Sequence, residues 1–193
     1  MRIDKWFPTV IGVADCDFIN DVKEEYSKIL STIKDKEHGF FYYQLQSDKR
    51  FKRLTDWVTD NVNEYAKLHY FEDEYEIGES WVNDYDVGGG QPYHAHNGWT
   101  ISCNFIFESD ENDVPTVFKS PYYVDPKNPT KTSPQRDSEI CLNEYTFRSA
   151  IYKPIVGRLL IFRSNIEHCT GPGPKTMKSK RTIFAFNLDP KKE

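Results

Sequence analysis

The sequence predicts a mainly β domain, a β-sandwich or jelly roll, with two helices towards its N-terminal end. Two observations support this fold class. Aromatic residues make up 15% of the 193 residues, and Phe and Tyr favour the pleated surface of a sheet. The spacing of apolar residues is helical in the first third of the chain and alternates after it, as expected for helices that cover antiparallel strands. The length suits one domain with a substantial core.

The first third of the chain predicts two helices and two strands. Segment 7–13 is apolar and reads as a first strand. Apolar residues then recur at helical spacing over 18–33 and again over 54–68, so each predicted helix has one apolar face. The aromatic run at 40–46 predicts a short strand between them. We assign residues 1–75 to a helical support region.

The remaining residues predict an antiparallel β core with Gly and Pro turns. The expected strands are 79–87, 96–107, 157–164 and 181–188. Segment 108–150 is polar and rich in Pro, Asn, Asp and Lys. A long connection of this kind often serves as a lid or binding loop. We therefore expect a jelly-roll core over 76–190 that carries an insertion or lid at 108–150, within a single domain spanning 1–193.

Composition and charge argue against several classes of protein. The formal net charge is −5, which disfavours general binding to nucleic acid. No apolar run approaches the roughly 20 residues of a membrane span, and the N-terminus does not resemble a signal peptide. The four cysteines are scattered without a CxxC pair and are expected to be reduced thiols in the cytoplasm; they are Cys16, Cys103, Cys141 and Cys169.

Two histidines stand close together in the stretch QPYHAHNGWTISCNFIF. If a strand begins at His94, then His94 and His96 point to the same side of it. His168 follows the long strand expected at 157–164, and in a jelly roll that part of the chain can lie beside the first pair. Three imidazoles on one face suit a metal ion that keeps open coordination positions, as in non-haem iron oxygenases.

An arginine opens the last predicted strand. Arg181 shares its face of that strand with Ile183, Ala185 and Asn187, and the other face is more apolar. An arginine in such a setting is costly to bury without an anion, and a carboxylate would pair with its guanidinium through two parallel hydrogen bonds. The three candidate metal-binding histidines and Arg181 together indicate a ligand with at least one carboxylate.

The ordered set of these residues resembles the iron(II)- and 2-oxoglutarate-dependent oxygenases, and within them an uncharacterised branch with an H-x-H…H…R pattern. The resemblance covers most of the chain and rests on Trp81, Asn83, Gly88, His94, His96, Gly157, Leu159, Phe162, Ser164, His168, Arg181, Phe186 and Asn187. It implies a double-stranded β-helix, which is a jelly roll, with Fe(2+) as cofactor and 2-oxoglutarate and O2 as cosubstrates. Decarboxylation of 2-oxoglutarate to succinate would then be coupled to oxidation of a second substrate, with hydroxylation as the default outcome.

The resemblance also implies roles for individual residues. His94, His96 and His168 would bind the metal, and Arg181 would anchor the distal carboxylate of 2-oxoglutarate. Tyr85 stands upstream of the first histidine, where related prolyl hydroxylases have a tyrosine that contacts the cosubstrate. Asn83 and Asn104 are nominated with Tyr85 as cosubstrate-binding residues.

The chain departs from the common pattern of the family at the second metal ligand. His96 stands where most members have a carboxylate, so the expected site holds three neutral imidazoles. In the alternative, His96 supports the site from outside, and a carboxylate from Asp84, Asp86 or Glu108 completes it. A second departure is Ile183, which stands where some relatives have a serine two residues after the arginine.

Two other function classes remain compatible with the sequence. One is a cupin-like metal dioxygenase with three histidines that does not use 2-oxoglutarate. The other is a jelly-roll protein that binds a ligand without catalysis. The sequence leaves the prime substrate and the oligomeric state open, since this fold serves many chemistries.

Overall fold

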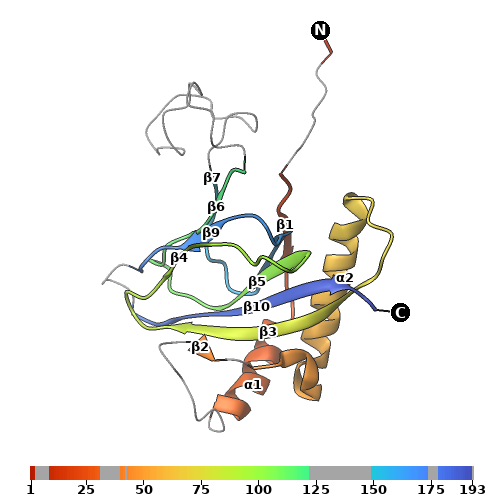
Figure 1. Ribbon diagram of the computed structural model, residues 1–193. Helices are drawn as coiled ribbons and strands as arrows, with labels where there is room; N and C mark the ends of the chain where they lie inside the picture. Colours follow the sequence, from red (N-terminus) through yellow and green to blue (C-terminus); the bar gives the residue numbers. More distant parts are fainter. Residues whose placement is uncertain (3–8, 31–39, 42, 122–148, 174–177, 193) are drawn as a thin grey trace.

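The computed structural model describes residues 1–2, 9–30, 40–41, 43–121, 149–173 and 178–192 (Figure 1). Part of the segment expected at 7–13, the last residues of the first predicted helix, and 122–148 of the predicted 108–150 insertion lie outside these ranges. The helices are α1 (Ile19–Leu30) and α2 (Lys52–Leu68), and two 3-10 turns, η1 (Leu45–Ser47) and η2 (Lys49–Phe51), precede α2. The strands are β1 (Gly12–Asp15), β2 (Phe40–Phe41), β3 (Tyr75–Tyr85), β4 (Gln91–His94), β5 (Ile101–Glu108), β6 (Thr116–Lys119), β7 (Ser149–Tyr152), β8 (Arg158–Arg163), β9 (His168–Thr170) and β10 (Arg181–Pro190).

The strands form two antiparallel sheets, as the predicted jelly roll requires. The larger sheet has the order β1-β8-β5-β10-β3-β2, and the smaller has the order β4-β9-β6-β7. Neighbours in both sheets are far apart in sequence, which is typical of a jelly roll. The two sheets face one another without closing into a barrel, and the smaller one lies at the upper left of Figure 1.

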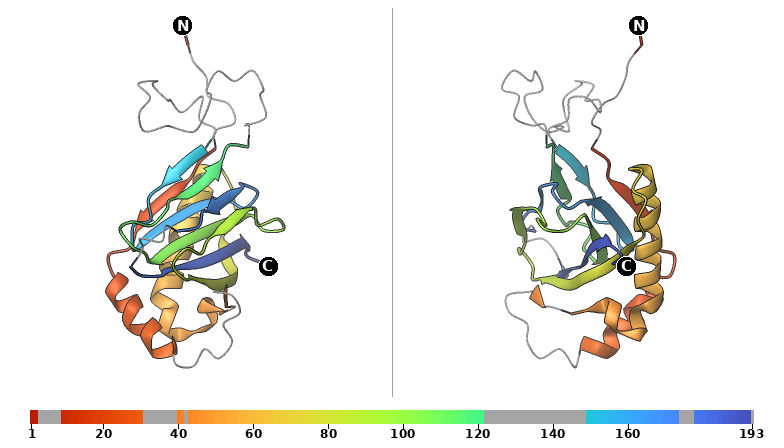
Figure 2. Two further views of the ribbon diagram at one scale, coloured as in Figure 1. Left: turned by 90° about the vertical axis from the view of Figure 1, so that its left-hand side faces the viewer. Right: turned by 45° about the vertical axis from the view of Figure 1, so that its right-hand side comes forward.

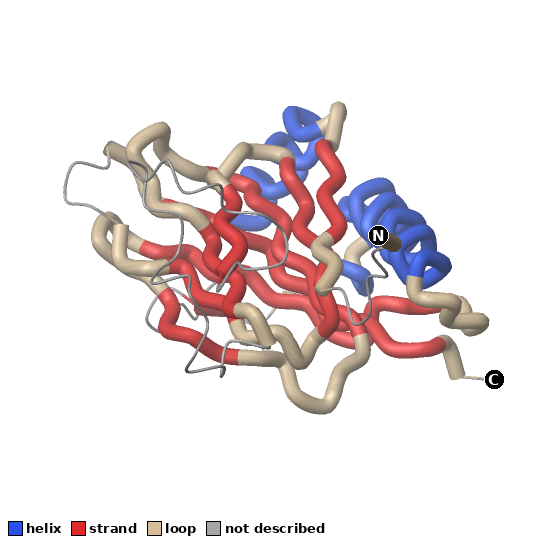
Figure 3. Tube along the Cα trace, turned by 90° about the horizontal axis from the view of Figure 1, so that it is seen from above, coloured by secondary structure: helices blue, strands red, loops and turns tan. Residues whose placement is uncertain are grey.

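Both helices pack on the face of the larger sheet that is turned away from the smaller sheet (Figure 2). Seen from above, they gather along one side of the strands (Figure 3). α1 buries Val22, Tyr26 and Ile29, which are spaced to lie on one face of a helix. α2 buries its own stripe of apolar residues, except that the expected member at its last position, Leu68, is 71% exposed. The spacing of apolar residues predicts which face of a helix is buried. It does not predict where along the helix the contact with the sheet ends.

The central strands of the larger sheet are buried on both faces. All but the last residue of β5 are buried, because the helices cover one face and the smaller sheet covers the other. On β10, Phe184, Phe186 and Leu188 belong to the core under the helices. The residues that alternate with them, including Ile183 and Asn187, face the smaller sheet, as the sequence predicts.

A smaller apolar cluster fills the space between the sheets. It consists of Phe118 on β6, Leu160 and Phe162 on β8, and Ile166 in the turn before β9. The ring of Phe162 lies 4.6 Å, centroid to centroid, from the imidazole of His168. Through Phe162, this cluster therefore packs His168, one of the candidate metal ligands, against the larger sheet.

Two of the strands expected in the first third of the chain differ from the structure. The first strand is Gly12–Asp15, later than the expected 7–13. The expected strand at 40–46 is limited to β2, and the chain then turns into η1. There the backbone N–H of Leu45 donates to the hydroxyl of Ser80 at 2.8 Å, and the Leu45 side chain is buried. A buried leucine anchored by a side-chain acceptor thus overrides the β preference of the aromatic run.

Among the described helices, none has the length and apolar character that crossing a membrane needs.

Candidate metal and cosubstrate site

Three histidines converge between the two sheets at one end of the smaller sheet. β4 pairs with β9 so that His94 lies directly opposite His168. The ring centroids of His94 and His168 are 4.3 Å apart, and that of His96 lies 5.2 Å from the first and 5.1 Å from the second. Their potential ligand nitrogens all lie within 4.8 Å of one another. Because metal–imidazole bonds are about 2.0–2.1 Å long, a single ion fits among these nitrogens after small side-chain rotations.

His96 reaches the site from a turn, which differs from the expected strand geometry. His94 is the last residue of β4, and the expected strand at 96–107 begins only at Ile101. The backbone N–H of His96 donates to the carbonyl oxygen of Ser164, just after β8, at 2.8 Å. The two imidazoles therefore share a side because the turn is hydrogen-bonded to the larger sheet, and not because of alternation along one strand.

Each of the three imidazoles uses its Nδ1 atom for an internal hydrogen bond. The Nδ1 atom of His94 lies 2.9 Å from the carbonyl oxygen of Pro92, and that of His168 lies 3.2 Å from the carbonyl oxygen of Ile166. The Nδ1 atom of His96 lies 2.7 Å from Oδ1 of Asn187. Because a carbonyl oxygen only accepts, each Nδ1 carries the proton and each Nε2 keeps its lone pair. This is the tautomer that a metal ligand needs when it binds through Nε2.

Burial keeps the two inner histidines neutral. It lowers the pKa of His168 to about 3, and the nearby His94 acts in the same direction. Burial also lowers the pKa of His96, against a smaller opposing effect of its hydrogen bond to Asn187. A neutral imidazole binds a cation without first losing a proton. Within the described residues the cluster contains no carboxylate, and Asp84, one of the alternatives, instead contacts Lys180 and Thr182.

A small polar cavity opens beside the three histidines. It is lined by Trp81, Asn83, Tyr85, Gln91, His94, His96, Asn104, His168, Thr170 and Ile183. The structure thus brings the nominated residues Tyr85, Asn83 and Asn104 to the same space as the histidines. The free volume is about 10 Å³, room for about one water molecule. A larger ligand needs side chains to move.

Tyr85 contributes a neutral hydroxyl to this cavity. Burial raises its pKa to about 12, although the positive charge of Arg181 acts against the rise. Its hydroxyl donates to Oε1 of Gln91 at 2.5 Å. The sequence did not indicate Gln91 or Thr170, because each enters the cavity through the pairing of β4 with β9 and neither belongs to a motif.

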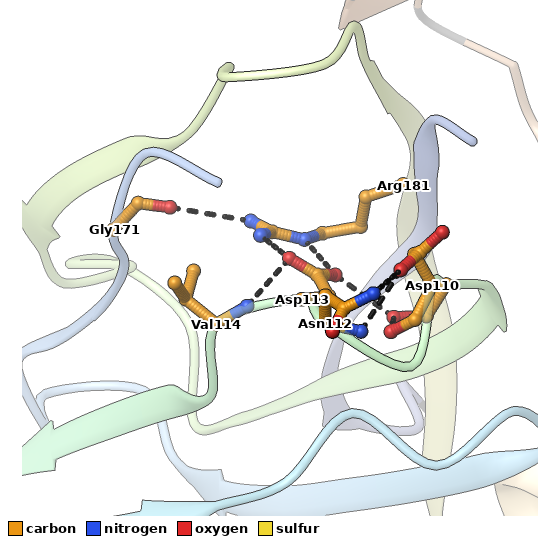
Figure 4. Close-up of polar contacts among 7 residues, drawn as sticks. Asp110, Asn112, Asp113, Val114, Gly171 and Arg181 are labelled. Carbon is orange, nitrogen blue, oxygen red and sulfur yellow. Dashed lines mark hydrogen bonds and ion pairs between the residues drawn. The ribbon is translucent and has the colours of Figure 1, made fainter. Parts of the chain in front are cut away.

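Arg181 is not among the residues that line the cavity. Its guanidinium is already paired (Figure 4). Its Nε donates to Oδ2 of Asp113 at 2.6 Å, and its Nη2 donates to the other carboxylate oxygen. The Arg181 side chain is 1% exposed and that of Asp113 is 0% exposed. The guanidinium carbon also lies 5.8 Å from the centre of the Tyr85 ring. Arg181 thus has the bidentate carboxylate partner that its sequence context predicts, but the protein itself supplies it.

Asp113 is held in place by the connection between β5 and β6. Its carboxylate also accepts from the hydroxyl of Ser109 at 2.8 Å and from the backbone N–H of Val114 at 2.7 Å. Asp110 fastens this connection to the chain before β10 by accepting from the backbone N–H of Lys178 at 2.9 Å. Sequence reasoning missed Asp113, because an aspartate in a polar connection has no local signal for a partner 68 residues away.

The jelly roll and the converging histidines define a class of protein, the mononuclear non-haem metal oxygenases. Residues 79–187 match the family described as "Putative 2OG-Fe(II) oxygenase". This match covers more than half of the chain, and the protein therefore belongs to the 2-oxoglutarate- and iron(II)-dependent oxygenase family. Family membership confirms the expected resemblance and the expected set of Fe(2+), 2-oxoglutarate and O2.

Solved structures with the same fold support this assignment to a jelly roll. A prolyl-4-hydroxylase from Pseudomonas putida has a TM-score of 0.61 at 8% identity, over 95% of this chain and 94% of that one. HygX from Streptomyces hygroscopicus, solved with nickel and 2-oxoglutarate bound, has a TM-score of 0.61 at 11% identity, over 94% and 83% of the two chains. The non-haem α-ketoglutarate-dependent epimerase SnoN from nogalamycin biosynthesis has a TM-score of 0.66 at 9% identity, over 94% and 77%. A search of the curated proteins found no match.

Proposed function

We propose that the protein is a hydroxylase that holds Fe(II) with His94, His96 and His168. The observation that carries this proposal is the convergence of three imidazoles, each with its Nδ1 atom bonded internally and its Nε2 atom free to bind a metal. Three protein ligands leave positions for a chelating cosubstrate and for O2. When bound, iron(II) supplies the redox chemistry that couples the conversion of 2-oxoglutarate and O2 to succinate and CO2 with hydroxylation of a second substrate.

The neutral lining of the cavity suits the end of the cosubstrate that lies near the metal. Tyr85 stays protonated at physiological pH, since its pKa is about 12, so it can donate a hydrogen bond to a carboxylate. Asn83 and Asn104 bring further amide groups to the same space. We assign these three side chains to orientation of 2-oxoglutarate, while the apolar cluster around Phe162 limits the entry of water.

We assign Arg181 to the distal carboxylate of 2-oxoglutarate, in exchange for Asp113. The two carboxylates are chemically equivalent partners for a guanidinium, so the buried charge of Arg181 stays compensated in both states. The small free volume also requires that something moves when a five-carbon diacid enters. Movement of residue 113 would break its hydrogen bonds to Ser109 and Val114, and the exposed neighbours Glu111 and Asn112 leave room for the connection to shift outward.

Binding of 2-oxoglutarate to metal-loaded protein under anaerobic conditions tests these assignments. Arg181→Lys keeps the charge but loses the planar fork, so it should weaken 2-oxoglutarate binding and leave metal binding largely intact. Arg181→Ala should cost about 2–5 kcal/mol of cosubstrate binding. His96→Ala should instead weaken the binding of the metal. Calorimetry measures both affinities. If Arg181→Ala binds 2-oxoglutarate as tightly as the wild type, the proposed anchor is wrong.

Two observations favour a second function. The cavity lining contains no cation among the described residues, and Arg181 is already neutralised by Asp113. Both features suit a three-histidine dioxygenase that does not use 2-oxoglutarate. Oxygen consumption and succinate formation distinguish the two functions. Succinate formed in step with O2 uptake supports the hydroxylase, and O2 uptake with a suitable substrate but without 2-oxoglutarate supports the alternative.

The described cysteines fit the proposed cytoplasmic location. Cys16, Cys103 and Cys169 are free thiols, and the first two are buried. Burial raises the pKa of Cys103 well above its usual range, so this thiol is protonated and unreactive. The remaining cysteine, Cys141, lies outside the described residues.

A further inference from the structure

His96 differs from the other two histidines in how its ring is oriented. The Nδ1 atoms of His94 and His168 each meet a backbone carbonyl two residues earlier in the chain. Any sequence that forms the same turns supplies those acceptors. The Nδ1 atom of His96 instead meets the side chain of Asn187, 91 residues away on β10. The orientation of His96 therefore depends on particular side chains of the larger sheet.

Asn187 belongs to a row of polar residues that crosses three neighbouring strands. β10 pairs with β3 and β5 so that Asn187 lies opposite Glu79 on one side and opposite Ser102 on the other. Asn187 is 3% exposed. Its Nδ2 donates to Oε2 of Glu79 at 3.1 Å, and its Oδ1 accepts from the hydroxyl of Ser102 at 2.7 Å. The Ser102 hydroxyl also lies 2.7 Å from that of Ser164, whose carbonyl holds the backbone of His96.

These contacts allow only one arrangement of protons. An ionised Glu79 carboxylate can only accept, so the amide nitrogen of Asn187 must face it. The amide oxygen of Asn187 must then face His96, where it can only accept. The Nδ1 atom of His96 must therefore donate, and its Nε2 atom keeps the lone pair that points to the other histidines. The Asn187 amide thus links the carboxylate of Glu79 to the imidazole of His96 through two hydrogen bonds.

We propose that Glu79 and Asn187 are positioning residues that make His96 a metal ligand. Glu79 fixes the orientation of the Asn187 amide, and the amide fixes the tautomer and angle of the imidazole. The inference rests on the proposed three-histidine site. It also explains how this chain dispenses with a carboxylate among its ligands, because Glu79 supplies a negative charge two hydrogen bonds behind His96. Groups that hydrogen-bond to a metal-ligating histidine, as Asn187 does to His96, commonly change the metal affinity by about 10- to 100-fold.

The test compares substitutions in this relay with a matched change outside it. Glu79→Gln removes the charge, and its side-chain amide can donate as well as accept, so it no longer forces the Asn187 amide to face one way. Asn187→Leu removes the amide, and Asn187→Asp keeps an oxygen that accepts from His96 but loses the N–H that donates to Glu79. Glu76→Gln is the control, because Glu76 lies on the same strand, is exposed, and loses the same charge. His96→Ala reports whether the metal needs this ligand at all. Circular dichroism and thermal unfolding check that each variant folds.

Two measurements are made on each protein. Calorimetric titration with Co(II), a redox-stable probe, gives the metal affinity. Long-range nitrogen–proton NMR of metal-free protein with labelled histidine gives the tautomer of His96, whose signals are assigned by their loss in His96→Ala. The tautomer does not depend on turnover, so it separates a positioning role from general damage to the enzyme.

We expect metal binding to weaken about 10- to 100-fold in Asn187→Leu, to weaken less in Glu79→Gln but by clearly more than about twofold, and to stay within about twofold of the wild type in Glu76→Gln. Asn187→Asp should retain most of the affinity and the Nδ1–H form of His96. If Asn187→Leu does not fold, Glu79→Gln and Asn187→Asp still test the relay. Unchanged affinity in Glu79→Gln while His96→Ala loses the metal, or an Nε2–H form of His96 in the wild type, overturns the relay. If His96→Ala also binds the metal normally, the three-histidine site itself is wrong.

Discussion

The imidazole of His168 lies in an environment that disfavours its protonated, charged form. It is 2% exposed, packs against the ring of Phe162, and lies beside two other imidazoles. These surroundings lower its pKa to about 3, whereas in the unfolded chain the value is about 6.5. The protein therefore keeps this candidate ligand neutral at the expense of stability in acid.

The stability of the metal-free protein should fall as the pH drops below about 6.5. Between that value and about 3 the unfolded chain binds a proton on His168 that the folded protein does not, so acid favours unfolding. One such group contributes a slope of about 1.4 kcal/mol per pH unit. Denaturant unfolding at several pH values measures it, and His168→Leu removes the titrating group. Equal pH slopes in the wild type and in His168→Leu would contradict the prediction.

At the scale of secondary-structure elements, the approach of β4 to β9 depends on a glycine. A Cβ atom on Gly90, just before β4, would lie 2.5 Å from the carbonyl group of Gly171, just after β9. Since real Cβ atoms do not approach backbone atoms so closely, the two strands would have to separate. These strands place His94 opposite His168, so their spacing sets the spacing of two candidate ligands.

Gly90→Ala should therefore weaken both metal binding and stability. Forcing a methyl group into such a space costs about 1–3 kcal/mol. Gly171→Ala is the matched control, because a Cβ there meets no atom within 4 Å. Calorimetry with Co(II) and thermal unfolding measure the two effects. Equal behaviour of Gly90→Ala and Gly171→Ala would show that this close approach does not control the site.

The connection between β5 and β6 places a carboxylate where the cosubstrate is proposed to bind. Without 2-oxoglutarate, Asp113→Asn leaves the buried charge of Arg181 unpaired and should cost about 3–5 kcal/mol of stability. The same change removes the competing carboxylate, so 2-oxoglutarate should bind more tightly and raise the melting temperature more than in the wild type. Thermal unfolding with and without 2-oxoglutarate measures this.

Asp110→Asn is the control for this loop, since Asp110 contacts backbone groups and the side chain of Asn112 but not Arg181. The exchange of carboxylates on Arg181 is refuted if 2-oxoglutarate raises the melting temperatures of Asp113→Asn and the wild type equally. A gain seen also in Asp110→Asn would instead point to general loosening of the loop.

At the scale of the whole molecule, one core joins the helices to the sheet. The rings of Phe107 and Phe184 stack 4.6 Å apart, centroid to centroid, and Tyr26 of α1 packs on both. The proposed helical support region, 1–75, and the proposed jelly-roll core, 76–190, therefore share their apolar interior. We propose that they form a single domain that folds as one unit.

Unfolding should accordingly be a single cooperative transition. Far-ultraviolet circular dichroism follows the helices, and tryptophan fluorescence follows residues in both regions, including Trp57 on α2 and Trp81 on β3. The two signals should give the same midpoint and the same free energy of unfolding. A fragment that begins at residue 76 should be insoluble, because it exposes Phe105, Phe107 and Phe184. Two separated transitions would contradict a single domain.

Short-range patterns in the sequence account for much of the molecule. The apolar period places α1 and α2 to within a few residues, and alternation places β3, β8 and β10 and the two faces of β10. The ordered set of His94, His96, His168 and Arg181 is sufficient to indicate the family. These features are readable because the period of a helix or strand depends on residues only a few positions apart.

Contacts between distant residues are decided only by the packing of the two sheets. The sequence predicts His94 and His96 on one strand, whereas a turn bonded to Ser164 brings His96 to the site. The pairing of Arg181 with Asp113 and of His96 with Asn187 spans 68 and 91 residues. No local pattern encodes such partners, because strand register and the path of a connection depend on how the whole core packs. The residues of the candidate site can therefore be predicted from the sequence. The position of the proton on His96 and the charge partner of Arg181 are decided only by the tertiary fold.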